Sequence, residues 1–107
     1  MSFYLIQASY AAPATASMVK NPQDRAAVVS AMIERAGGKL HGLWLAFGEY
    51  DVVAIAELPD AVSAAAMSMA IGSSGTMSAY RTTPLLTPAE SVAAMKKASG
   101  VGYQPPK

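Results

Sequence analysis

The sequence predicts an α+β fold, and three observations lead to this prediction. Four short segments are rich in β-branched and aromatic residues, as strands are. They alternate with helix-like segments in the order βαββαβ, followed by one extra C-terminal helix. The 107 residues suffice for one domain, which we expect over residues 1–100, with a flexible tail over 101–107. Right-handed crossovers fold this order into a four-stranded antiparallel sheet with both main helices on one face, the ferredoxin-like sandwich.

The first part of the chain predicts a strand, a loop and a helix. Residues 3–10 carry Phe, Tyr, Leu and Ile and suit a largely buried strand. Residues 11–20 are expected to form a loose loop. Asn21 can accept a hydrogen bond from a free N–H at a helix start, and Pro22 fits the first helical position because its missing N–H has no partner there. The glycine pair 37–38 then supplies the positive-φ geometry that ends the helix.

The middle of the chain predicts a hairpin. Residues 39–47 and 52–58 read as strands, joined by a short turn over residues 48–51. Both strands are mostly apolar on two faces, which is typical of strands covered on both sides. Strict alternation places His41 and Trp44 on opposite faces of the second strand.

The last part of the chain predicts a helix, a strand and a further helix. Asp60 is expected to cap a helix over residues 61–71, and residues 77–86 read as the fourth strand. Residues 87–90, Thr-Pro-Ala-Glu, combine a capping box with proline at the first helical position. The helix that follows is expected to end at Gly100.

The composition is apolar for so small a chain. Hydrophobic residues make up 52% of the sequence and charged residues 14%, with a net charge of +1. Because about a quarter of residues are usually charged, we expect a second copy of the chain to cover apolar surface. We therefore expect the chain to form a homodimer or higher homo-oligomer through the sheet face that carries no helices. A small apolar or aromatic ligand is a further expected partner.

Several other classes are not expected. The basic residues are scattered and cannot line up along a row of phosphates, so no nucleic acid is predicted as a partner. No apolar stretch is long enough to cross a membrane. The chain has no Cys, which removes thiolate metal sites and fits a reducing, cytoplasmic location. We expect no metal and no cofactor.

The hairpin also carries a resemblance to a known family. Residues 38–53 read GKLHGLWLAFGEYDVV and precede Pro59-Asp60. They resemble the GYD domain of bacterial proteins, whose Gly, Tyr and Asp match Gly48, Tyr50 and Asp51, and the resemblance extends from the first strand to Thr87-Pro88. It implies a dimeric α/β-barrel and no general biochemical function or agreed catalytic residues. A similar turn occurs in effector-binding domains of leucine-responsive regulators, but this chain has no room for their helix-turn-helix.

The turn has a structural and a functional interpretation. In the structural one, Gly48 adopts a backbone conformation that other residues avoid, Asp51 accepts hydrogen bonds from N–H groups of the turn, and Tyr50 packs its ring. In the functional one, Glu49, Tyr50 and Asp51 form the rim of a ligand or partner site. Glu49 and Asp51 are two residues apart and would share a face, where their carboxylates could act as acid and base.

Two further candidates lie in the second strand. His41 is the only histidine, so no multi-histidine metal site can form within one chain. We interpret it as an ordinary, partly exposed side chain, with a general base or a single haem ligand as alternatives. Trp44 is predicted to anchor a dimer rather than to form the stacking wall of a pocket.

Arg81 is the charge that interrupts the fourth predicted strand. A buried arginine needs a carboxylate or an anionic ligand. We expect an internal pair with Asp51 or Glu57, and anion binding is the alternative.

Two hypotheses for function follow. The first is a non-catalytic, ligand-binding or accessory protein built as a dimeric barrel. The alternative is a cofactor-independent enzyme, monooxygenase- or isomerase-like, acting on a small aromatic or polyketide-like substrate. That enzyme would need an apolar cavity between sheet and helices, lined by groups such as His41, Tyr4, Tyr80 or Arg81.

Overall fold

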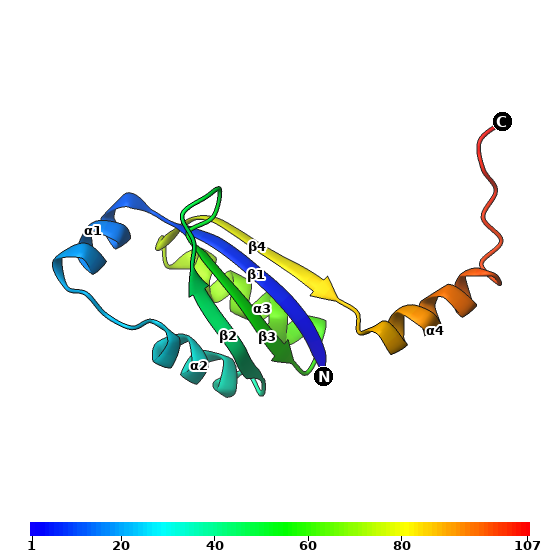
Figure 1. Cartoon of the computed structure of the whole chain (residues 1–107), viewed down its shortest axis with the longest axis horizontal. Coiled ribbons are helices and arrows are strands. Elements are labelled where there is room, and N and C mark those ends of the chain that lie inside the picture. Colours follow the sequence, from blue (N-terminus) through cyan, green and yellow to red (C-terminus); the bar gives the residue numbers. More distant parts are fainter.

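The computed structural model describes all of residues 1–107, with one four-stranded antiparallel sheet and four helices (Figure 1). The strand order is β2-β3-β1-β4, which is compatible with the ferredoxin-like arrangement. The strands are β1 (Ser2–Tyr10), β2 (Lys39–Leu45), β3 (Val52–Leu58) and β4 (Met77–Leu85). The helices are α1 (Ala12–Lys20), α2 (Ala26–Arg35), α3 (Ala61–Ser73) and α4 (Pro88–Ala98).

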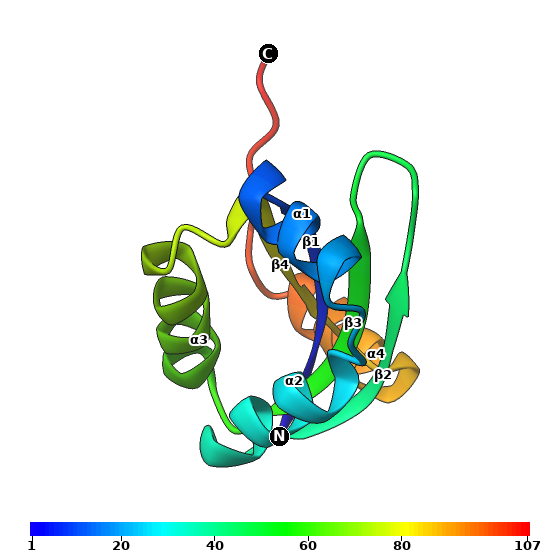
Figure 2. The same cartoon turned by 90° about the vertical axis from the view of Figure 1, so that its left-hand side faces the viewer.

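Helices α2 and α3 pack against one face of the sheet, as the sequence predicts (Figure 2). α2 contacts β2, and α3 contacts β3 and β4. Burial follows the pleat of β3, in which every second residue from Val52 to Leu58 is buried and the intervening ones are half-exposed. The core beneath the helices consists of Tyr4, Ile6, Ile33, Ala54, Ala56, Leu58, Ala64 and Met67.

The other face of the sheet is here called the open face. In each strand, the side chains that alternate with the buried ones point to this face. The strand register brings these side chains of all four strands together. Most of its central members are apolar and partly exposed. The open face comprises Phe3, Leu5 and Gln7 of β1, Lys39, His41 and Trp44 of β2, Val53, Ile55 and Glu57 of β3, and Arg81, Thr83 and Leu85 of β4.

A β-bulge in β2 changes which residues share a face. The register passes from Leu40 opposite Ala56 to Gly42 opposite Ile55, so His41 is the extra residue. The prediction that His41 and Trp44 lie on opposite faces is therefore wrong. His41 bonds to Glu57 of the open face, and the ring of Trp44 lies against Gly42 on that same face.

Two predictions between β1 and α2 are also wrong. Residues 11–20 do not form a loop, because α1 occupies most of them; alanine favours helix, and Pro13 is tolerated in the first turn. α2 does not begin at Pro22 under an Asn21 cap but at Ala26. Its first N–H is held by Asp24, whose carboxylate accepts from the Ala26 N–H at 2.8 Å.

The end of α2 matches the glycine prediction. Gly37 has φ +86°, a conformation that side chains with a Cβ rarely adopt. Its N–H donates to the carbonyl of Glu34, and the Gly38 N–H donates to that of Ile33, which together form a Schellman motif. A Cβ on Gly38 would lie 2.1 Å from the Glu57 carbonyl oxygen. The glycine pair therefore lets the chain turn directly from α2 into the sheet.

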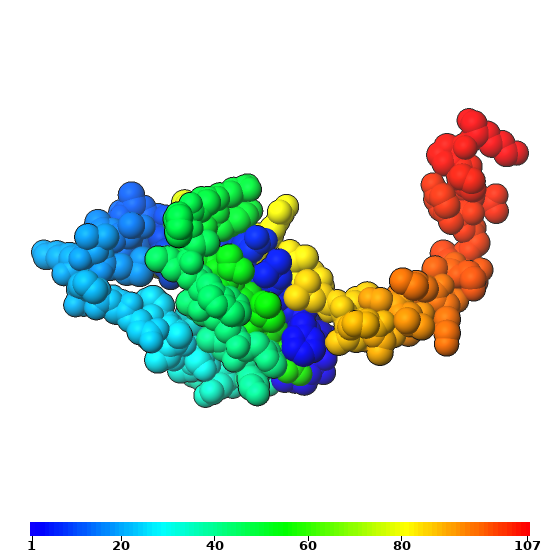
Figure 3. All heavy atoms as spheres, in the orientation of Figure 1, coloured from blue at the N-terminus to red at the C-terminus, as the bar shows by residue number.

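The molecule is elongated because α4 and the C-terminal residues extend away from the sheet (Figure 3). The radius of gyration is 17.0 Å, whereas about 13 Å is usual for a globular chain of this length.

α4 has the predicted capping box: the Glu90 N–H donates to the Thr87 hydroxyl, and the Thr87 N–H donates to the Glu90 carboxylate.

Asp60 caps α3 as expected, and this contact makes stability depend on pH. Its carboxylate accepts from the Ser63 N–H at 2.8 Å. Hydrogen bonds from the backbone and the side chain of Ser63 lower the pKa of Asp60 below its ordinary 3.8. A lowered folded-state pKa means that the cap stabilises the fold above the unfolded-state pKa and that this contribution is lost as pH falls through the folded-state pKa.

We therefore expect Asp60→Asn, which keeps a capping oxygen but cannot titrate, to flatten the acid side of the stability curve. The melting temperature of the wild type and of the variant is measured from about pH 6 to about pH 2. Between these limits the wild type is expected to lose more stability than the variant. Parallel curves for the two proteins would contradict the role given to Asp60.

Candidate functional site

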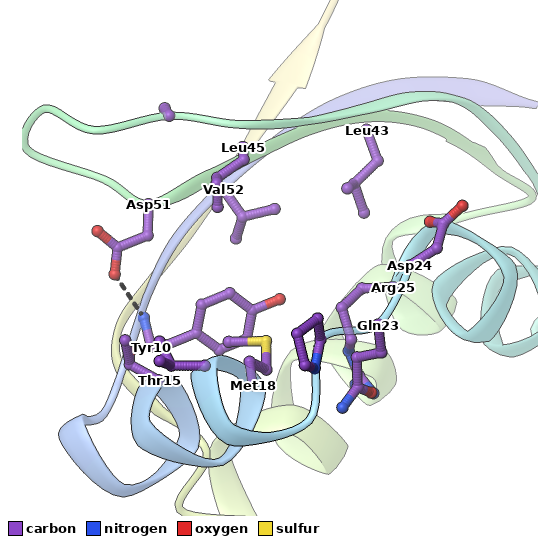
Figure 4. A pocket seen from close by; sticks show the side chains of 13 residues that line it. Tyr10, Thr15, Met18, Gln23, Asp24, Arg25, Leu43, Leu45, Asp51 and Val52 are labelled. Atoms are coloured by element: carbon purple, nitrogen blue, oxygen red, sulfur yellow. Dashed lines mark hydrogen bonds between the residues drawn. The ribbon is translucent and has the colours of Figure 1, made fainter.

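The largest cavity lies between α1, the segment that joins α1 to α2, and the end of the β2–β3 hairpin (Figure 4). Its volume is about 520 Å³, which is within the range of small-molecule sites. We call it the Tyr10 cavity. Its lining residues are Tyr10, Thr15, Met18, Val19, Pro22, Gln23, Asp24, Arg25, Leu43, Leu45, Ala46, Asp51 and Val52.

Tyr10 connects this cavity to the interior of the domain. It also lines a narrow apolar space of about 40 Å³ between the sheet and helices α2 and α3, and a further hollow of about 280 Å³ between those helices. In Figure 4 the Tyr10 ring lies beside Met18, and Leu43 and Val52 lie across the cavity from them. A ligand in the Tyr10 cavity would therefore contact aromatic and aliphatic side chains from both α1 and the hairpin.

Arg25 supplies the positive charge in the wall of this cavity. One terminal nitrogen, Nη1, donates to the Gln23 amide oxygen at 3.1 Å. The Nε atom is buried and has no hydrogen-bond partner. The Arg25 guanidinium forms no ion pair, so its charge can attract an acceptor or anionic group of a ligand at this wall.

Asp51 fixes the hairpin to the end of β1. Its carboxylate accepts from the Tyr10 N–H at 3.0 Å, shown dashed in Figure 4, and its own N–H donates to the Ala8 carbonyl at 2.9 Å. The predicted hydrogen bonds to the turn itself are therefore replaced by bonds to a strand about forty residues away in sequence. Asp51 thus fixes the position of Tyr10, which lines the cavity.

The other turn residues do not behave as expected. Gly48 has no positive φ, and a Cβ there would meet open space, so the prediction of a glycine-only backbone conformation is wrong. Glu49 is exposed, its carbonyl accepts from the Ser9 hydroxyl, and it does not line the cavity with Asp51. Tyr50 is half-buried and likewise lies outside the cavity lining. The structure therefore does not bring two carboxylates of this turn to one cavity.

Tyr80 and Tyr4 lie on the helix side of the sheet. Tyr4 is part of the core. The Tyr80 ring lines the narrow apolar space next to Tyr10, and its hydroxyl is buried without a hydrogen-bond partner. Burial raises the pKa of the Tyr80 phenol, and the neighbouring hydroxyls of Thr82 and Ser68 offset part of this rise. Tyr80 therefore stays neutral and can donate a proton in a hydrogen bond.

The remaining candidates lie on the open face, away from the Tyr10 cavity. His41 Nε2 lies 2.8 Å from Glu57 Oε1, and the His41 ring lies 5.2 Å from that of Phe3. Trp44 is 56% exposed. Arg81 is exposed and forms no ion pair, so the predicted pair with Asp51 or Glu57 is wrong. Glu57 is taken by His41, and Arg81 is opposite Gln7 in the register.

The side chains of the cavity wall could not be predicted from the sequence. Met18 lies in the expected loop, and Gln23, Asp24 and Arg25 lie in the expected first turns of the helix that instead begins at Ala26. Alanine-rich residues 12–16 signalled the extra helix. Nothing local signalled that the segment between α1 and α2 would lie opposite the hairpin.

No group of three or more His, Cys, Asp or Glu side chains is placed to hold a metal ion. None of the helices combines the length and the apolar character that crossing a membrane requires.

Comparison with known proteins gives one match. Searches of curated proteins and of solved structures returned no similar protein. A family model, described as the GYD domain, matches residues 4–95. This range contains almost all of the sheet, helices α1 to α3 and most of α4, and it includes every residue that lines the Tyr10 cavity. The chain thus belongs to the GYD domain family.

Proposed function

We propose that this chain is a homodimeric binding protein that holds a small, largely apolar ligand bearing an anionic or hydrogen-bond-accepting group. The observation that carries the proposal is Arg25, which lines a mostly apolar cavity of about 520 Å³ and forms no ion pair. Apolar side chains supply the affinity of such sites, and a few polar groups fix the orientation of the ligand.

The hydrogen bonds around the cavity leave Arg25 as the group that would orient an acceptor on the ligand. The carboxylates of Asp24 and Asp51 already accept from backbone N–H groups, of Ala26 and Tyr10 respectively. Arg25 in contrast donates one hydrogen bond, to Gln23, and forms no ion pair. An aromatic carboxylate or a phenolate-like group beside Arg25 would therefore complete its hydrogen bonding.

The enzymatic alternative has less support. It requires catalytic groups in the cavity, and His41 and Arg81 lie on the open face instead. Tyr80 is a neutral donor whose ring lines only the narrow space beyond Tyr10. We therefore favour binding over catalysis.

The homodimer part of the proposal rests on the open face. Apolar side chains gather there, with Phe3, Leu5, Val53 and Ile55 in the middle of the sheet and Trp44 beside them. A second copy stacked on this face would remove them from water, at about 1.5–3 kcal/mol for each fully buried side chain. Trp44 is then an anchor of the interface, as large exposed aromatics commonly are.

Filling the cavity tests the binding proposal. The probe is 1-anilinonaphthalene-8-sulfonate, which is apolar, anionic and fluorescent when bound. Ala46 lines the cavity, so Ala46→Trp is expected to weaken binding of the dye at least tenfold, about 1.4 kcal/mol. Arg25→Gln, which removes the charge, is expected to weaken the dye but not its uncharged parent, N-phenyl-1-naphthylamine.

The matched control is Ala65→Trp, because Ala65 is exposed on α3 and lies outside the Tyr10 cavity. It should bind both dyes as the wild type does. Equal affinity of Ala46→Trp and the wild type would place the dye elsewhere and remove the cavity as the binding site.

A further inference from the structure

The C-terminal arm, defined as residues 86–107, has no partner within its own chain. It leaves the end of β4 and runs away from the sheet (Figures 1 and 3). No residue of α4 is buried. The arm nevertheless carries large apolar side chains, all of them exposed: Leu86, Val92, Met95, Val101 and Tyr103.

The arm is built to be a helix that packs against something. Its capping box satisfies the N–H groups of Thr87 and Glu90, and Lys96 and Lys97 lie at its negative end. A helix of 11 residues is nevertheless marginal on its own in water, since isolated helices need about 12–15 residues or more. Helices of this length are stabilised by burying one face.

One face of α4 suits burial and the opposite face suits water. Val92, Met95 and Ser99 follow the i, i+3, i+7 spacing of a single stripe. Glu90 and Lys97 are seven residues apart and share the other side of the helix. The stripe is therefore an unpartnered surface with a defined orientation.

The exposed area gives the size of the interface that a partner would cover. The chain exposes 7356 Å², about 1,700 Å² more than the roughly 5,600 Å² usual for a folded protein of 11.0 kDa. If each of two copies buried this excess, the interface would total about 3,400 Å², which is within the range of permanent homodimers. Only ten residues are buried in the single chain, and an interface of this size would add to that small core.

The position of the arm points to a second copy as that partner. Leu85 is the last residue of the open face, and the arm begins at the next residue. A copy stacked on the open face would therefore have the arm at its rim. α4 is about 16 Å long, comparable with the width of a four-stranded sheet at about 4.8 Å per strand. A two-fold axis then makes the contact mutual, with each arm on the other copy.

We propose that the C-terminal arm of each copy packs, through the stripe of Val92 and Met95, on the second copy of the dimer. This inference rests on the proposed homodimer. It adds that the two chains exchange their arms, so that the stability of α4 depends on the partner.

The chain contains no Cys, so a spin label can be placed at a single site. Lys96→Cys is prepared with a nitroxide spin label and without nitrogen-15. It is mixed with wild type that is enriched in nitrogen-15 and carries no spin label, and the two proteins are allowed to exchange subunits. The arm of the spin-labelled chain is then expected to broaden amide signals of the enriched chain. In the control sample, Lys96→Cys carries both the spin label and nitrogen-15. It is mixed with excess wild type that carries neither, so that broadening reports contacts within one chain.

Substitutions on the two sides of α4 provide the matched pair. Met95→Lys places a charge in the stripe and is expected to weaken dimerisation at least about tenfold in sedimentation equilibrium, as a desolvated unpaired charge requires. Ala94→Lys, on the polar side of the same helix, is expected to leave the dimer unchanged.

The outcomes separate this inference from the proposal beneath it. A wild type that sediments as a monomer would overturn the homodimer and the arm exchange together. A dimer in which broadening occurs only within the labelled chain, or in which Met95→Lys and Ala94→Lys behave alike, would overturn the arm exchange alone. Binding of the dye in the Tyr10 cavity is measured separately and depends on neither result.

Discussion

Ile55→Asp is expected to convert the dimer to monomers. Ile55 lies in the middle of the open face, between Leu5 of β1 and Gly42 of β2. In a stacked pair each copy would bury a carboxylate without a partner, and two such sites occur per dimer. We expect the dimer dissociation constant to rise at least about a hundredfold, or about 2.8 kcal/mol. Sedimentation equilibrium over a range of protein concentrations measures this change.

The control for Ile55→Asp is Val62→Asp. Val62 is 78% exposed on α3, which covers the other side of the sheet. This variant should remain dimeric. Circular dichroism of both variants checks that the fold is kept. If Ile55→Asp stays folded and dimeric, the open face is not the interface between copies.

Leu58→Ala is expected to cause the largest loss of stability of a single chain. Leu58 is fully buried at the end of β3 and belongs to the core beneath the helices. Truncation of a buried leucine removes apolar contacts and leaves a cavity, which usually costs about 2–5 kcal/mol. Urea denaturation at one fixed protein concentration measures the free energy of unfolding of wild type and variant.

Val62→Ala serves as the comparison for Leu58→Ala, because the Val62 side chain is exposed. A change within about 0.5 kcal/mol is expected there. If the two variants were equally stable, the core would not be centred where the structure places it.

The parts of the fold that could be predicted from the sequence are those determined by neighbouring residues. β3 has the bounds predicted for it, 52–58, and the capping residues Asp60 and Thr87 act as expected. The glycine pair 37–38 ends α2 in the predicted way. Each of these features depends on hydrogen bonds or alternation within a few residues, so the local sequence contains the whole signal.

The errors arise where a residue's role depends on a distant strand. His41 is the extra residue of a β-bulge, which moves it to the same face as Trp44, and only the pairing with β3 shows this. Gly42 was a usable signal, since glycine within a strand often marks a bulge. Arg81 interrupts a strand, which predicts a buried partner, but the register places it on the open face, where it is exposed.

The candidate site was less predictable than the fold. The turn motif indicates Asp51 as a candidate, and Asp51 does line the Tyr10 cavity. Its hydrogen bond to Tyr10 and the facing wall that includes Arg25 join segments far apart in the chain. No periodicity or spacing in the sequence connects these segments.

The sequence by itself determined the order of strands and helices, their caps, and the excess of apolar over charged residues, because these depend on residue type and short spacing. The sequence also indicated an apolar sheet face without helices. The tertiary structure alone decided which side chains form that face, and that further apolar surface lies along the C-terminal arm and in the Tyr10 cavity. The physical reason is that exposure and cavity shape arise from the packing of whole elements. A side chain's neighbours across the sheet are set by register and bulges, and these form only when the chain folds.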